Sequence, residues 1–172
     1  SLYSPSTQEQ EVARLIVETM ARWGYQAEVD ASDNAVGHFG KGKPEIVLLG
    51  HMDTVPGEIP VRREGDLLYG RGTVDAKGPL AAFIVATTRA AAKGAQVGVA
   101  VIGAVEEECT SSKGAHYAAG RYQPAYAVIG EPSAWNRITL GYKGRLLVDY
   151  TLERPMSHTA GQERGVCEEA VD

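Results

Sequence analysis

A histidine and an aspartate two residues apart, His51 and Asp53, are the side chains in this sequence that point most directly to chemistry. They lie just after the apolar run 46–49, which is typical of a buried strand. In extended backbone, residues i and i+2 point the same way, so both side chains can face one pocket. An imidazole that binds a metal ion is commonly oriented by a carboxylate. We therefore expect His51 to bind a metal ion and Asp53 to orient its ring.

Three further acidic segments follow predicted strands or a tight glycine turn. Asp75 comes after Gly70-Arg71-Gly72, three glutamates (106–108) follow the apolar run 97–105, and Glu131 follows a third apolar run. Acids at the end of a buried strand are costly unless a cation meets them. Any one of them alone could be solvated or cap a helix, but the whole set indicates a common site.

Carboxylates and one imidazole, without thiolates, are ligands that suit zinc, cobalt or manganese. One bridging carboxylate can hold two such ions about 3.5–4 Å apart, which lowers the pKa of a shared water. A carboxylate that binds no ion can then take the proton of that water. The sequence therefore predicts metal-dependent hydrolysis of an amide or ester bond by the set His51, Asp53, Asp75, Glu107, Glu108 and Glu131.

Alternating strands and helices are expected to position these residues. The hydrophobic pattern predicts strands at 26–29, 35–39, 46–49, 97–105 and 125–129. It predicts helices that begin near Ser6 and near Ser111, and a helix over 80–92 that is apolar nearly all round and buried. Ser6 and Glu9 fit a capping box for the first helix. The alternation indicates an α/β fold with a mostly parallel sheet and helices on both faces.

The pattern changes after residue 137. Strand character returns at 138–142 and 146–152, and residues 165–171 fit the beginning of a helix. We therefore expect residues 1–143 to form the N-terminal part of a catalytic domain. Residues 144–172 are expected to begin a second, smaller domain that is incomplete.

Composition excludes several classes of function. The chain has 172 residues, enough for one compact domain with a core. A net charge of −5 provides no basic footprint for nucleic acid. No apolar run approaches the roughly 20 residues that span a bilayer, so no membrane partner is expected. Two cysteines, Cys109 and Cys167, do not form a disulfide framework, which favours a reducing cytoplasm.

The acidic segments and their neighbours resemble the M20 family of dinuclear zinc peptidases and deacylases. The motifs that carry the resemblance are Gly50-His51-Met52-Asp53-Thr54-Val55-Pro56, Tyr69-Gly70-Arg71-Gly72-Thr73-Val74-Asp75-Ala76-Lys77-Gly78, the glutamate run, and Gly130-Glu131-Pro132. The resemblance implies a three-layer α/β/α catalytic domain interrupted by a smaller α+β lid domain that often dimerises. It therefore implies a homodimer whose catalytic domain holds two divalent ions, zinc first, with cobalt or manganese possible.

The resemblance also implies a role for each site residue. His51 resembles a ligand of one zinc, oriented by Asp53, and Asp75 resembles the ligand that bridges both. Glu131 resembles a ligand of the other zinc. The family's glutamate pair supplies the general base and then a ligand, which implies Glu107 and Glu108; a register shifted to Glu106 and Glu107 stays open. His158, in Ser157-His158-Thr159-Ala160, resembles the lid histidine that reaches a neighbouring subunit's site and stabilises the oxyanion.

Softer motifs resemble one branch of that family, which releases lysine or ornithine from an N-acyl group or from a carrier-protein glutamyl conjugate in lysine and arginine biosynthesis. The expected partners are thus a small acylated amino acid or an acidic amino-group carrier protein. Open alternatives are an acetylornithine deacetylase, a succinyl-diaminopimelate desuccinylase, a carboxypeptidase or dipeptidase, and a non-catalytic metal-binding fragment. The family's last zinc ligand is a histidine beyond the lid, so we expect this chain to be the N-terminal part of a longer enzyme. The branch motifs are Gly57-Glu58-Ile59-Pro60-Val61-Arg62, Ser111-Ser112-Lys113-Gly114-Ala115, Gly130-Glu131-Pro132-Ser133 and Gly141-Tyr142-Lys143-Gly144-Arg145.

Overall fold

A computed structural model describes residues 2–134, 136–144, 146–155 and 165–171. The chain forms two compact units, Ser1–Arg137 and Ile138–Asp172. Their elements, in chain order, are α1 (Gln10–Arg22), β1 (Gln26–Val29), β2 (Ala35–Phe39), β3 (Ile46–His51), β4 (Arg62–Glu64), β5 (Leu67–Tyr69), α2 (Lys77–Ala92), β6 (Val99–Ala104), α3 (Lys113–Arg121), β7 (Tyr126–Ile129) and α4 (Val166–Ala170).

The first unit is built on a five-stranded sheet with the order β1-β2-β6-β3-β7. Strand β3 runs parallel to β6 and to β7, whereas β2 is antiparallel to both of its neighbours. Four of the five strands therefore point the same way, as the sequence predicts. In the ladder His51 lies opposite Ala104, and Leu49 lies opposite Ile129. Strands β6, β3 and β7 thus end together, and the acidic segments leave the sheet at one edge.

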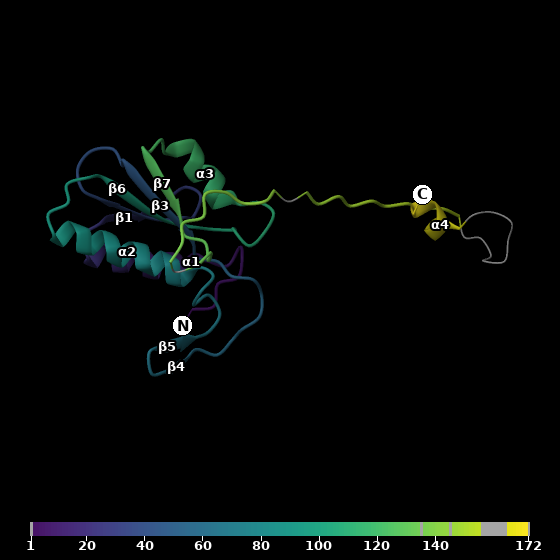
Figure 1. The fold of residues 1–172 in the computed structure, drawn as a ribbon, viewed down its shortest axis with the longest axis horizontal. Coiled ribbons are helices and arrows are strands. Elements are labelled where there is room, and N and C mark those ends of the chain that lie inside the picture. Colours follow the sequence, from purple (N-terminus) through teal and green to yellow (C-terminus); the bar gives the residue numbers. More distant parts are fainter. Residues whose placement is uncertain (1, 135, 145, 156–164, 172) are drawn as a thin grey trace. The chain divides into compact units, whose positions relative to one another are not determined.

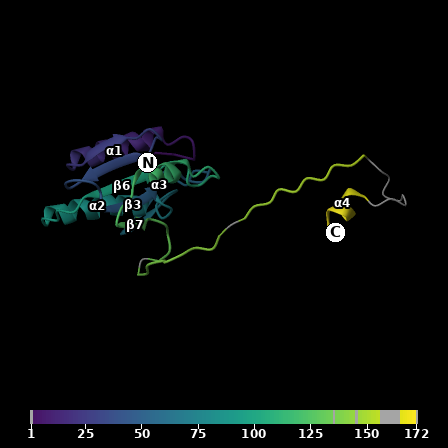
Figure 2. The same cartoon turned by 90° about the horizontal axis from the view of Figure 1, so that it is seen from above.

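Helices cover both faces of this sheet, which confirms the three-layer α/β/α prediction (Figures 1 and 2). Helices α1 and α2 lie on one face, where Met20 and Leu80 belong to the same core cluster as Val101. Helix α3 lies on the other face, where Ala118 packs with Ile102. Neighbouring residues of β6 enter opposite clusters because side chains alternate along a strand. Full burial of a side chain such as Leu80 stabilises the fold by about 1.5–3 kcal/mol.

Two predictions about the helices are wrong. Helix α2 is not buried all round: Leu80, Ile84 and Thr87 are buried, but Val85 is exposed, because the helix lies on a single face of the sheet. The capping box of Ser6 and Glu9 does not form either. Helix α1 begins at Gln10, and Glu9 precedes it without a side-chain capping hydrogen bond. The side chains of Ser6 and Glu9 bind the loops at the sheet edge instead.

The second unit contains helix α4 and an ion pair of 2.6 Å between Arg154 and Glu169. Its described residues in 138–142 and 146–152 form no strand, contrary to the sequence prediction. The side chains of Ile138 and Leu140 are 87% and 96% exposed, so neither packs against a neighbouring strand among the described residues. No helix among the described parts of the chain is long and apolar enough to cross a membrane.

Candidate metal centre

His51 lies at the centre of a cluster of carboxylates at the carboxyl edge of β3, β6 and β7. Its Nε2 atom is 3.0 Å from Oδ1 of Asp75. The same nitrogen is 3.8 Å from Oε2 of Glu107 and 3.7 Å from Oε1 of Glu131. Segments that lie far apart in the sequence thus converge on one imidazole nitrogen, at the place where open α/β sheets carry their sites.

Two overlapping sets of ligand atoms are close enough to hold an ion. One set is His51, Glu107 and Glu131, and the other is His51, Asp75 and Glu108; within each, the ligand atoms lie within 4.8 Å of one another. Each ring nitrogen of a histidine has one lone pair, so Nε2 can bind only one ion. Among the described residues, a second ion at this edge would therefore have only carboxylates as ligands.

Asp53 holds the other side of the imidazole ring. Nδ1 of His51 is 3.0 Å from the backbone oxygen of Asp53 and 3.3 Å from its Oδ1 atom. Asp53 is fully buried, and its carboxylate also accepts hydrogen bonds from the backbone N–H groups of Glu107 and Glu108, at 3.1 and 3.0 Å. Burial raises the pKa of Asp53, but the hydrogen bonds from His51, Ser6 and these N–H groups outweigh it, and the net pKa is lowered. The charged form of Asp53 therefore keeps Nε2 directed at the cluster.

The charges of the cluster explain why it needs a cation. Burial alone would lower the pKa of His51, but its hydrogen bond to Asp53 and the charges of Glu131 and Asp53 raise that pKa to about 9. Burial, opposed by His51 and reinforced by the neighbouring carboxylates, raises the pKa of Glu131 to about 7. The pKa of Glu108 is raised by burial and by Asp75. Without a metal ion, protons partly neutralise a site that carries too much negative charge.

The geometry fits a divalent ion such as zinc. Two ligand atoms about 2.1 Å from a tetrahedral zinc ion lie about 3.4 Å apart. The distances from Nε2 of His51 to the carboxylates of Asp75 and Glu131, 3.0 and 3.7 Å, bracket that value. The ligand chemistry fits as well, because imidazole and carboxylate suit zinc, cobalt and manganese.

The turn that carries Asp75 is folded around a glycine. Gly72 has φ +81°, and its carbonyl accepts the backbone N–H of Lys77 at 3.0 Å. A Cβ atom at Gly72 would lie 3.1 Å from side-chain atoms of both Thr54 and Lys77, so a larger residue would strain the backbone and displace these side chains. The peptide bond between Asp75 and Ala76 is cis. This turn brings Asp75, half exposed, over the Nε2 atom of His51.

The glutamate run is turned at Glu106. This residue has φ +56°, a left-handed conformation that is uncommon outside glycine. Its carboxylate accepts a hydrogen bond from Ser111, whereas Glu107 and Glu108 belong to the two ligand sets. This arrangement is the one expected if Glu107 and Glu108 form the functional pair.

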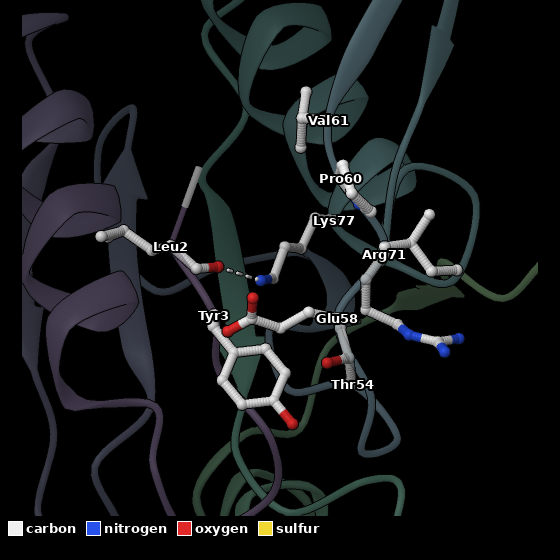
Figure 3. A pocket seen from close by; sticks show the side chains of 9 residues that line it. Leu2, Tyr3, Thr54, Glu58, Pro60, Val61, Arg71 and Lys77 are labelled. Carbon is white, nitrogen blue, oxygen red and sulfur yellow. Dashed lines mark hydrogen bonds between the residues drawn. The ribbon is translucent and has the colours of Figure 1, made fainter.

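Two cavities lie near the loops of the site, and one of them is lined by residues of the cluster. One, of about 300 Å³, is bordered by Asp75 and Glu108 together with the glycine turn 70–74. The other, of about 160 Å³, is lined by Thr54 together with Leu2 and Lys77 (Figure 3). There Nζ of Lys77 donates to the backbone oxygen of Leu2 at 3.0 Å, and Oγ1 of Thr54 is buried without a hydrogen-bond partner among the described residues. The first cavity is where a substrate could approach the cluster.

The structure thus brings six of the predicted site residues together: His51, Asp53, Asp75, Glu107, Glu108 and Glu131. His158 lies outside the described residues. Sequence reasoning missed Ser6 and Glu9 as neighbours of the site. Both residues are polar and able to form hydrogen bonds, but their spacing in the sequence predicts a helix cap and not a role at this site.

The fold and the cluster define the class: an α/β/α domain with a candidate metal centre at the carboxyl ends of its parallel strands. The chain belongs to the peptidase family M20/M25/M40, whose sequence model matches residues 47–167.

Among curated relatives, a LysW-lysine hydrolase from Deinococcus radiodurans is 50% identical over 163 residues, which is 94% of this chain and 45% of the relative. A LysW-lysine/LysW-ornithine hydrolase from Saccharolobus solfataricus is 33% identical over 96% of this chain and 46% of its own length. The chain therefore spans about half the length of the curated relatives that it matches.

Solved structures support the fold. A tripeptidase from Staphylococcus aureus superposes with a TM-score of 0.64 at 19% identity, over 77% of this chain and 40% of its own. An M20 family metallo-carboxypeptidase from Sulfolobus solfataricus superposes with a TM-score of 0.61 at 21% identity, over 74% of this chain and 34% of its own. At these identities the likeness concerns the fold alone.

Proposed function

We propose that this chain carries the metal centre of a hydrolase that cleaves an amide bond to release lysine or ornithine. The observation that carries the proposal is the convergence of Asp75, Glu107 and Glu131 on Nε2 of His51, within 3.0–3.8 Å. Several carboxylates held close together repel one another and are costly to bury unless a cation compensates their charge. The cluster is therefore better explained by a bound metal ion than by a structural role.

Each residue of the cluster then takes a role. His51, Glu131 and Glu108 would be ligands, and Asp75 would be the carboxylate shared by two divalent ions. Bound ions would lower the pKa of a water molecule and polarise the carbonyl of the substrate. Zinc is our first choice of ion, with cobalt and manganese next.

Glu107 is the proposed general base. It lies within reach of the cluster, is 40% exposed, and is held by the hydrogen bond from its backbone N–H to Asp53. Its carboxylate accepts the proton of the attacking water and then delivers it to the leaving amine. His158 remains the predicted group that stabilises the oxyanion, by resemblance alone.

The substrate assignment rests on relatives. Proteins 50% and 33% identical to this chain bear names of hydrolases acting on LysW-lysine or LysW-ornithine. We infer that this chain serves the same reaction class, with an acidic carrier protein bearing the amino acid as its partner. We propose in addition that residues 144–172 begin a lid domain through which two copies associate, and that the protein works in the cytoplasm.

Turnover by the purified chain tests this function. The chain, loaded with zinc, is incubated with the carrier-protein conjugate of lysine, N-acetyl-lysine, N-acetylornithine and N-succinyl-diaminopimelate, and the released amino acid is quantified. We expect lysine or ornithine release, with a rate that falls by about 10²–10⁴ in Glu107→Gln while the bound zinc is unchanged. A rate no higher than that of Glu107→Gln, or cleavage of succinyl-diaminopimelate alone, would contradict the assignment.

A further inference from the structure

The segment that precedes α1 is tied to the loop that carries the metal centre. The backbone oxygen of Ser4 accepts the N–H of Thr54 at 3.0 Å, and Pro5 forms a parallel bridge with Thr54. Oγ of Ser4 donates to the backbone oxygen of Met52 at 2.8 Å. Residues 4 and 5 therefore lie along the loop after β3, joined to it by one isolated bridge, and the residues up to α1 bring two polar side chains to the site.

Ser6 acts on the buried carboxylate that orients the histidine. Its Oγ atom donates to Oδ2 of Asp53 at 2.7 Å, a charge-assisted hydrogen bond. The other oxygen of Asp53 faces Nδ1 of His51. Because four donors share this carboxylate, removal of one of them loosens the orientation of the ring.

Glu9 acts on the turn that places the two functional glutamates. Its Oε1 atom accepts the backbone N–H of Glu106 at 2.9 Å, and the residue is only 3% exposed. Glu106 is the residue in the left-handed conformation, which costs a non-glycine residue roughly 1–2 kcal/mol. That turn is what directs the N–H groups of Glu107 and Glu108 at Asp53.

The hydrogen bonds of these two side chains serve the loops of the site and not helix α1. As helix caps they would bind the first N–H groups of α1, but Glu9, which precedes the helix, makes no side-chain capping hydrogen bond. Burial of a carboxylate is costly unless its hydrogen bonds compensate. Glu9 accepts the N–H of Glu106, the residue at which the glutamate run turns. Ser6 donates to Asp53, the carboxylate that orients His51.

We propose that Ser6 and Glu9 are positioning residues of the metal centre. Ser6 holds His51 through Asp53, and Glu9 holds Glu107 and Glu108 through the turn at Glu106. Neither residue belongs to the two ligand sets of the cluster. The inference deepens the proposed function, on which it rests, because it names what keeps that site assembled before an ion arrives.

The test compares the affinity of the whole chain for Zn²⁺ and the visible absorption of its Co²⁺ form across four variants. Ser6→Ala and Glu9→Ala are expected to weaken Zn²⁺ binding by about 10–100-fold and to alter the Co²⁺ spectrum. Two controls separate positioning from stability. Ser4→Ala removes a buried hydrogen bond of the same segment without touching Asp53 or Glu106, and Glu9→Gln keeps an acceptor for the N–H of Glu106. Both should bind Zn²⁺ within about threefold of the parent chain.

Melting temperatures recorded alongside distinguish the outcomes. If Ser4→Ala weakens Zn²⁺ binding as much as Ser6→Ala at an equal loss of melting temperature, or if Glu9→Ala binds Zn²⁺ like the parent chain, the positioning role is wrong. Failure of the proposed function would give a different result. The variants would show the expected differences in Zn²⁺ affinity, but neither the parent chain nor any variant would hydrolyse a substrate. A parent chain that bound no divalent ion would overturn both.

Discussion

Replacement of Asp53 by asparagine is the perturbation whose effect the structure defines most closely. Oδ1 of Asp53 receives the N–H of Glu107 and faces Nδ1 of His51, whereas Oδ2 receives Ser6 and the N–H of Glu108. An asparagine side chain has one acceptor oxygen and one donor group. Whichever way the amide is turned, a backbone N–H group of the glutamate pair faces a donor.

The magnitude follows from these contacts. A buried N–H group without an acceptor costs about 1–3 kcal/mol, and the remaining hydrogen bonds lose the charge that strengthens them. Ser6 can limit the loss, because its hydroxyl can rotate and accept. We therefore expect Asp53→Asn to lower the free energy of unfolding by about 2–4 kcal/mol and the affinity for Zn²⁺ by about 10–100-fold.

Urea denaturation of the metal-free chain and competition with a chromophoric chelator measure the two effects. Asp66→Asn is the matched control, since Asp66 is exposed in the turn between β4 and β5. That variant should stay within about 0.5 kcal/mol of the parent chain. An Asp53→Asn chain as stable as the control, with unchanged Zn²⁺ affinity, would refute the role given to this carboxylate.

Three further predictions address charge, backbone and metal. In the metal-free chain the pKa of His51 is raised from 6.5 to about 9. The protonated imidazole therefore contributes on the order of 3 kcal/mol to the free energy of unfolding below pH 6.5, and this contribution is lost as the pH rises through 9. Urea titrations between these pH values should show the loss, and His51→Gln should remove the pH dependence. Gly72→Ala should destabilise the chain more than Gly94→Ala in thermal melts, because both residues have positive φ but only Gly72 has neighbours within 4 Å of an added Cβ; equal losses would exclude the close approach at the turn. Chelation should lower the melting temperature of the zinc-loaded chain, and added Zn²⁺ should restore it in the parent chain but not in Asp75→Asn.

The sheet and most of the cluster could be predicted from the sequence because both follow from local patterns. Apolar runs at 46–49 and 97–105 define β3 and β6, and acids directly after parallel strands must share an edge. Convergence on one imidazole nitrogen follows from that topology. Fold and cluster thus depend on signals that extend over only a few residues.

Long-range partners of polar residues could not be predicted in this way. Ser6 and Glu9 have the spacing of a capping box, and sequence alone does not show that Asp53 and the N–H of Glu106, 47 and 97 residues away, compete for them. The charged carboxylate and the turn at Glu106 provide stronger partners than the first turn of α1. The exposed face of α2 was missed for a related reason, since an alanine-rich pattern does not tell how many layers cover a helix.

Anomalous scattering at the zinc absorption edge, recorded from crystals of the zinc-loaded chain, tests the central claim most directly. We expect two peaks beside Asp75, one within about 2.3 Å of Nε2 of His51 and both within that distance of carboxylate oxygens. No anomalous peak near His51, or side chains of Asp75 and Glu131 that point away from any ion, would contradict a hydrolytic metal centre in this chain.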